Sequence, residues 1–127
     1  MDVINISGTT PFTTKDGSTI REILSHRNSG IRNQSLAEAT VGPGMVTEAH
    51  YHPNSEEIYY VLSGTGEVFV GDDVRRVEIG DGIAIPPETP HQIRNVGGKD
   101  LVFLCCCAPT YEHDDTIIVG SLFGPHG

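Results

Sequence analysis

Turn signals recur at such short intervals along this chain that few segments are long enough for a helix. They stand at Gly42-Pro43-Gly44, Ser63-Gly64, Gly71-Asp72-Asp73, Gly80-Asp81-Gly82, Pro86-Pro87 and Gly97-Gly98. The runs between them predict strands at residues 35–41, 57–62, 67–70, 82–85, 91–96 and 101–107. The one helix candidate is a turn or so at residues 19–24. Closely spaced strands without helices between them predict an all-β antiparallel sandwich or barrel, jelly rolls included, and the pattern alone leaves that choice open.

Length and composition limit the classes of protein that the chain can belong to. Its 127 residues fit one domain, and 37% hydrophobic residues suffice for a modest core. A formal net charge of -9 opposes attraction to nucleic acid or to an anionic membrane surface. No stretch approaches the roughly 20 apolar residues that span a bilayer, and the N-terminus lacks the pattern of a signal peptide. The cysteines, Cys105-Cys106-Cys107, are adjacent and odd in number, which favours a reduced, cytoplasmic setting over a disulfide framework.

One stretch carries residues suited to metal chemistry. On a strand, His50 and His52 present both imidazoles on one face, and after a turn the chain returns with Glu57 and Tyr59 facing the same way. His91, which follows a proline-rich turn, is the obvious candidate for a third imidazole. Imidazole and carboxylate are common ligands of iron, manganese, nickel and zinc. Singly, each residue is more often a surface, packing or loop residue than a ligand, so the spacing has to decide.

That spacing closely resembles the cupin family. The first cupin motif is matched at Gly44, His50, His52, Glu57 and Gly64, and the second at Gly80, Pro86, His91 and Asn95. The short stretch between the motifs is similar to that of compact microbial cupins. The departure is Glu88, which stands where the second motif has glycine. If this position needs a positive φ, the glutamate carries strain.

The resemblance implies a fold, a site and an assembly. The fold would be a double-stranded β-helix, the jelly-roll barrel of cupins, with residues 1–127 as one domain and a core at about 35–109. From their own composition, the polar, Thr- and Gly-rich residues 1–18 are expected to form an N-terminal arm, and residues 110–127 a solvated tail or a flap over the barrel mouth. Inside the barrel one divalent transition metal ion would be held by His50, His52, Glu57 and His91, with two coordination positions left open. Small cupins usually form dimers, so a homodimer is expected.

Further residues are candidates for the pocket around this site. Tyr59 has the same inward parity as Glu57 and is a candidate proton donor or pocket wall. Glu48 shares the parity of His50 and His52 and could be a proton acceptor at the barrel mouth, although an exposed strand-end carboxylate is the more common outcome. On the apolar run 101–108, which predicts a strand buried on both faces, Phe103 and Cys105 would line the pocket as substrate-binding residues. The cysteines there are expected to be buried and inert.

The expected function is that of a metal-dependent enzyme acting on a small oxygenated molecule such as a keto acid, an enol or a phenol. Dioxygenase-like oxidoreductase chemistry is favoured over an isomerase, a decarboxylase or a polyketide cyclase. The preference is slight, because a fold shared by many activities does not choose among them. The alternative is a sensor or carrier that binds metal and ligand without turnover. The identity of the metal stays open among iron, manganese, nickel, zinc and copper.

Overall fold

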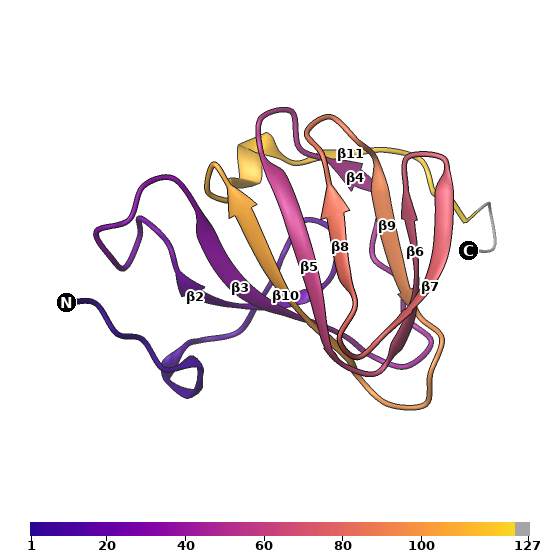
Figure 1. Cartoon of the computed structure of the whole chain (residues 1–127), viewed down its shortest axis with the longest axis horizontal. Helices are drawn as coiled ribbons and strands as arrows, with labels where there is room; N and C mark the ends of the chain where they lie inside the picture. The colour runs from indigo at the N-terminus through magenta and orange to yellow at the C-terminus, as the bar shows by residue number, and fades with distance from the viewer. Residues whose placement is uncertain (124–127) are drawn as a thin grey trace.

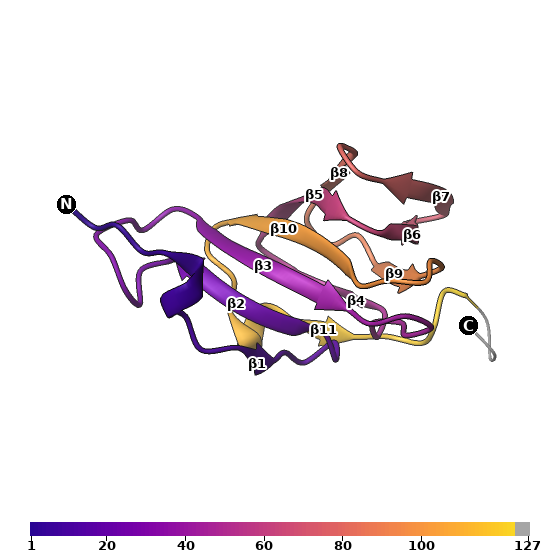
Figure 2. The same ribbon diagram turned by 90° about the horizontal axis from the view of Figure 1, so that it is seen from below.

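The computed structural model describes residues 1–123, which form two antiparallel β-sheets that face each other (Figure 1; Figure 2). Residues 124–127, the end of the expected C-terminal segment, lie outside the described residues. The larger sheet contains, in spatial order, β1 (Phe12–Thr13), β2 (Thr19–Leu24), β3 (Ser35–Val41), β10 (Leu101–Ala108), β5 (Glu56–Ser63) and β8 (Gly82–Ile85). The smaller sheet contains β11 (Ile117–Ile118), β4 (His50–Tyr51), β9 (His91–Asn95), β6 (Thr65–Val70) and β7 (Asp73–Glu78). Two 3₁₀ turns complete the fold, η1 (Ile6–Gly8) and η2 (His113–Asp115).

The strands predicted from the turn signals are all present, which confirms the all-β class. Strands β3 and β8 have the predicted ends, and the other predicted strands differ from the structure only by one or two residues at an end. Strand β7 was not predicted from the sequence, because most of its residues are exposed and only Val77 is buried.

The helix predicted at residues 19–24 is wrong. This segment is β2, and it pairs antiparallel with β3 from Thr19 opposite Thr40 to Leu24 opposite Leu36. The β-branched residues Thr19, Ile20 and Ile23 suit a strand, and β3 supplies the backbone partners that a short helix would have had to find within itself.

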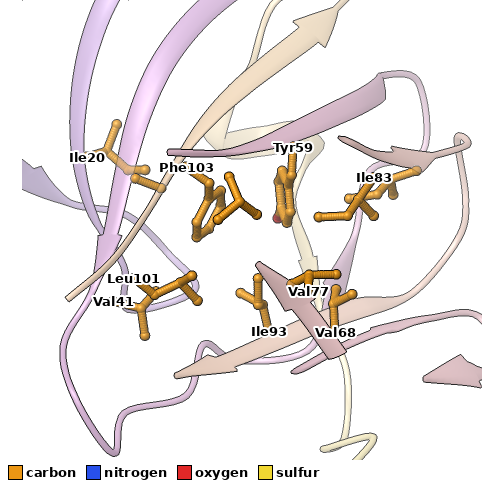
Figure 3. Packing of buried hydrophobic residues seen from close by; sticks show 12 residues of the cluster. Ile20, Val41, Tyr59, Val68, Val77, Ile83, Ile93, Leu101 and Phe103 are labelled. Carbon is orange, nitrogen blue, oxygen red and sulfur yellow. The ribbon is translucent and has the colours of Figure 1, made fainter. Parts of the chain in front are cut away.

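The hydrophobic core lies between the two sheets. Figure 3 shows Phe103 and Tyr59 side by side, with aliphatic side chains from both sheets around them. On β5 the buried side chains alternate with exposed ones, so Glu57, Tyr59 and Val61 face inward. Strand β10 was expected to be buried on both faces, but only its inward face is closely packed, and its outward residues are half-exposed. The residues of the core cluster are Ile20, Ala39, Val41, Tyr59, Val61, Val68, Val77, Ile83, Ile85, Ile93, Leu101 and Phe103.

The turn after β5 requires glycine. Gly64 has φ +86, and a Cβ at this position would lie 2.5 Å from the backbone oxygen of Asp100. Glu88 also has a positive φ, of 64°, as its place in the second motif suggested. Its backbone N–H donates a hydrogen bond to the carbonyl of His52, at 2.8 Å. The strained turn is thus connected directly to His52, which immediately follows β4.

Both terminal segments pack on the sheets of their own chain. Strand β1 pairs with β2, and β11 pairs with β4, so residues 12–13 and 117–118 extend the edges of the two sheets. The segment 110–118 is therefore part of the fold rather than a solvated tail. Among the described residues, no helix has the length and apolar character that crossing a membrane would require.

Candidate metal centre

The structure brings together the side chains that the two motifs predicted as ligands. The ligand atoms of His50, His52, Glu57 and His91 lie within 4.8 Å of one another, and all four residues are buried. His50 in β4 and His91 in β9 face each other across a strand pair of the smaller sheet. Glu57 comes from β5 in the opposite sheet. The group therefore joins both sheets at one end of the barrel.

Backbone carbonyls orient all three imidazoles. The Nδ1 atom of His50 lies 2.9 Å from the Glu48 carbonyl, that of His91 lies 2.9 Å from the Thr89 carbonyl, and that of His52 lies 3.0 Å from the Asp115 carbonyl. A carbonyl oxygen only accepts, so each Nδ1 carries the proton and donates it. Each Nε2 then presents a lone pair to the centre of the group, as metal-ligating histidines do.

Glu57 is held from one side and open on the other. Its Oε2 accepts a hydrogen bond from the Cys107 thiol, with Sγ 3.2 Å away. Its Oε1 lies 3.4 Å from both His52 Nε2 and His91 Nε2. Glu57 Oε1 and His91 Nε2 are buried without a hydrogen-bond partner in the described part of the chain. Buried polar atoms without partners are rare, and a cation between these acceptors would satisfy both, so the residues fit a divalent metal ion.

The pKa shifts of these residues favour a charged carboxylate at the centre of the group. Burial would raise the pKa of the Glu57 carboxyl, but the His52 and His91 imidazoles, each with Nε2 3.4 Å from Oε1, outweigh burial and lower this pKa far below its usual range. Burial also favours the neutral ring of His52, yet the nearby Glu57 carboxylate raises the pKa of His52. For His50, burial and the nearby His91 lower the pKa. Glu57 is therefore ionised at neutral pH and ready to bind a cation.

A pocket opens beside the four ligands, and the predicted pocket residues Tyr59, Phe103 and Cys105 line it. Burial, reinforced by the charge of Glu57, raises the pKa of both the Tyr59 hydroxyl and the Cys105 thiol, so both keep their protons. Glu48 does not line this pocket, and its side chain is exposed. Strand β4 begins only at His50, so the alternation that suggested an inward Glu48 does not extend back to it, and this corrects the expectation.

Two of the following pocket features, the roles of Asp16 and Cys107, were not found from the sequence, whereas a flap near Tyr111 was one of the alternatives. Asp16, in the loop between β1 and β2, lines the pocket with its Oδ2 3.8 Å from His50 Nε2. The Tyr111 ring lies 5.9 Å from that of His52, so the segment considered as a flap does cover one side of the site. Cys107, expected to be inert, orients Glu57. Asp16-Gly17 is a recognisable turn signal, but nothing in the pattern told which way its carboxylate points.

The chain matches known families and structures over most of its length. The family model described as a cupin domain matches residues 37–107. An uncharacterised protein of Methanocaldococcus jannaschii is 50% identical over 111 residues, which cover 86% of this chain and 87% of that protein. Protein SchB of Streptomyces halstedii is 35% identical over 95 residues, 73% of this chain and 69% of that protein.

The chain also matches a solved structure over most of its length. The crystal structure of a predicted oxalate decarboxylase from Thermotoga maritima is 25% identical, with a TM-score of 0.75, and the match covers 84% of this chain and 98% of that one. These matches confirm the double-stranded β-helix that the motifs predicted. This chain belongs to the cupin family.

Proposed function

We propose that this cupin is a metal-dependent enzyme that acts on a small oxygenated organic molecule chelated beside His50, His52, Glu57 and His91. The observation that carries the proposal is the pair of buried acceptors, Glu57 Oε1 and His91 Nε2, which lie 3.4 Å apart and have no hydrogen-bond donor among residues 1–123. A divalent ion bound there would act as a Lewis acid that lowers the pKa of a bound hydroxyl or enol. The residues of this chain orient the ligands and shape the pocket around them.

The pocket residues support a role in catalysis as well as in binding. Tyr59 keeps its proton and lines the pocket, so it is proposed as a proton donor to the bound molecule. Phe103 packs against Tyr59 with ring centroids 4.6 Å apart, and it fixes the tyrosine while giving the pocket an apolar wall. Cys105 lies on the same face of β10 as Phe103 and continues that wall as a neutral thiol. A protected pocket with a proton donor is what turnover needs beyond binding.

Several reactions start from a substrate activated in this way. The resemblance to cupins favours a dioxygenase-like reaction, whereas the similar protein from Thermotoga maritima is a predicted oxalate decarboxylase. Oxygen uptake by the metal-loaded protein, measured against a panel of diketones, keto acids and catechols, separates these reactions. Product formation without oxygen uptake would indicate a decarboxylase, isomerase or cyclase. Binding without any product would favour a sensor or carrier.

The test of the metal centre is elemental analysis of purified protein. Wild-type protein reloaded with a single first-row metal should hold one ion per chain, and His52→Ala and His91→Ala should hold much less. The control His26→Ala changes an exposed histidine that pairs with Glu112 and should leave the metal content unchanged. Unchanged stoichiometry in His52→Ala or His91→Ala would refute the proposal. Activity restored ion by ion identifies the metal.

The outer face of the larger sheet supports the expected homodimer. On β5, Ile58, Tyr60 and Leu62 are 55%, 45% and 40% exposed, and they lie beside the half-buried Leu104 and Cys106 of β10. Contiguous apolar residues on an exposed face are typical of protein–protein interfaces, and a second copy of the chain offers a matching face. Light scattering should give a dimer for the wild-type protein and a monomer for Ile58→Lys. A monomeric wild-type protein would contradict the homodimer without touching the metal centre.

A further inference from the structure

The loop between β1 and β2 holds one oxygen of Asp16 in place. Asp16 Oδ1 accepts hydrogen bonds from the Thr14 hydroxyl at 2.7 Å, from the Ser18 hydroxyl at 2.7 Å and from the Ser18 backbone N–H at 2.9 Å. The loop is closed by a hydrogen bond from the Thr14 N–H to the Ser18 carbonyl, and Gly17 supplies the left-handed conformation with φ +90. Such a network orients the carboxylate before any ligand arrives.

The same loop is tied to the strands that surround the site. The Asp16 carbonyl accepts a hydrogen bond from the Glu48 N–H at 2.7 Å, just before β4. Lys15 Nζ donates to the Thr116 carbonyl at 2.9 Å, beside β11, and Figure 2 shows β1 and β11 close together at this edge. Asp16 is therefore positioned by two segments of its own chain.

The second carboxylate oxygen points into the pocket. Asp16 Oδ2 lies 3.8 Å from His50 Nε2, and the side chain is only 12% exposed. This distance is too long for a hydrogen bond, and His50 Nε2 is itself an acceptor because its ring carries the proton on Nδ1. Within the described chain, the hydrogen bonds to the Asp16 carboxylate all reach Oδ1, so Oδ2 is available to accept a hydrogen bond from a donor in the pocket.

The charges of the pocket side chains restrict the class of molecule that can supply this hydrogen-bond donor. Among the described residues, its lining contains three carboxylates, from Asp16, Glu22 and Glu57, and neither lysine nor arginine. Glu22 lies 2.8 Å from the Arg27 guanidinium, which it shares with Glu112, so Glu22 leaves no unpaired positive charge beside the pocket. A divalent ion would balance Glu57 and Asp16, which leaves no positive charge for a second carboxylate on a substrate. The remaining walls include Phe12, Ile20 and Phe103, and they suit an apolar group.

We propose that Asp16 is a specificity-determining residue, which accepts a hydrogen bond from a hydroxyl group of a neutral, partly apolar molecule such as a phenol or enol and disfavours carboxylates. This inference rests on the proposed metal centre. It narrows the substrate class from oxygenated molecules in general to neutral hydroxyl compounds with an apolar part. Asp16 is not assigned as a metal ligand, because it lies outside the group of four whose ligand atoms converge.

The experiment compares two probes, catechol and oxalate, by calorimetry at one fixed pH on protein loaded with one metal. Wild-type protein should bind catechol more tightly than oxalate. In Asp16→Asn, catechol affinity should fall about tenfold and oxalate affinity should rise about tenfold, because a charge-assisted hydrogen bond and a repulsive charge are both removed. Asp16→Glu keeps the charge but displaces the oxygen, so it should lose catechol affinity without gaining oxalate affinity. Asp72→Asn, on an exposed turn, makes the same change in net charge and should alter neither affinity.

Metal content, measured on the same samples, separates failure of the metal centre from failure of the role of Asp16. If wild-type protein binds no metal, the proposed function fails and this inference with it. If metal binds but Asp16→Asn leaves both affinities unchanged, only the role of Asp16 is overturned. Loss of metal in Asp16→Asn would make Asp16 a ligand and overturn the assignment. An equal effect of Asp72→Asn would trace the selectivity to net charge and would also overturn it.

Discussion

The thiol of Cys107 offers the sharpest test of how the metal centre is oriented. This residue is 2% exposed, and its Sγ donates to Glu57 Oε2 at 3.2 Å. Burial and the charge of Glu57 raise the pKa of Cys107 far above its usual range, so the thiol keeps the proton that it donates. In Cys107→Ala the carboxylate loses this donor and can rotate away from the histidines. Loss of a partner that orients a ligand typically weakens metal affinity about 10- to 100-fold, or about 1.4 to 2.7 kcal/mol.

A competition titration against a chromophoric chelator measures this affinity, and thermal unfolding of the metal-free protein measures stability. Without metal, Cys107→Ala should lower the free energy of unfolding by about 1–3 kcal/mol, since a buried carboxylate oxygen is left without its donor. Cys107→Ser keeps a donor and should recover part of both losses. Cys106→Ala is the matched control, because Cys106 is half-exposed and its Sγ lies 3.9 Å from Gln34 Oε1. Metal affinity equal to wild type in Cys107→Ala would refute the orienting role.

Further predictions concern protonation and backbone geometry. Because Glu57 outweighs burial and raises the pKa of His52 above its ordinary value of 6.5, metal uptake at pH 6.5 must displace a proton, and affinity should fall as the pH falls through that pKa. Calorimetry in buffers of different ionisation enthalpy counts the released protons, and finding none at this pH would contradict the shift. Gly64→Ala should destabilise the protein by about 3 kcal/mol or more, because the new Cβ would overlap a backbone oxygen at a residue with positive φ. Gly80 has φ +91 but open space around its Cα, so Gly80→Ala should cost only about 1 kcal/mol. Chemical denaturation compares the two, and equal losses would argue against the steric explanation. Glu88→Gly should raise the free energy of unfolding by up to about 1 kcal/mol by relieving the φ of 64°, whereas Glu88→Ala should give no such gain.

The parts of the fold that follow local rules could be predicted from the sequence. Alternation along β5 places Glu57 and Tyr59 on the buried face, and the turn residues mark where most of the strands end. The ligand group was predicted because its members occupy fixed positions in two motifs. Glu88 was noted as a departure from the second motif, and the positive φ at this position shows why glycine suits it.

The parts that depend on distant partners could not be predicted in this way. Residues 19–24 become a strand only because β3 lies beside them. The orientation of Asp16 depends on hydrogen bonds within its loop and on the distant Glu48 N–H, and no periodic pattern records these contacts. Glu48 itself shows the limit of parity, which holds inside a strand and fails where the strand begins.

The three carbonyls that orient the imidazoles differ in where they come from, and this difference makes one imidazole depend on a distant segment of the chain. Glu48 and Thr89 stand two residues before His50 and His91, so those two rings are oriented by their own strand entrances. His52 depends on Asp115, which is 63 residues away and whose carboxylate also accepts hydrogen bonds from the backbone of Asn54 and Ser55. The third imidazole is therefore oriented only when the segment after β10 has closed over the turn that follows β4. Completion of the metal centre thus requires the C-terminal segment, and that same segment carries Tyr111 to the pocket wall.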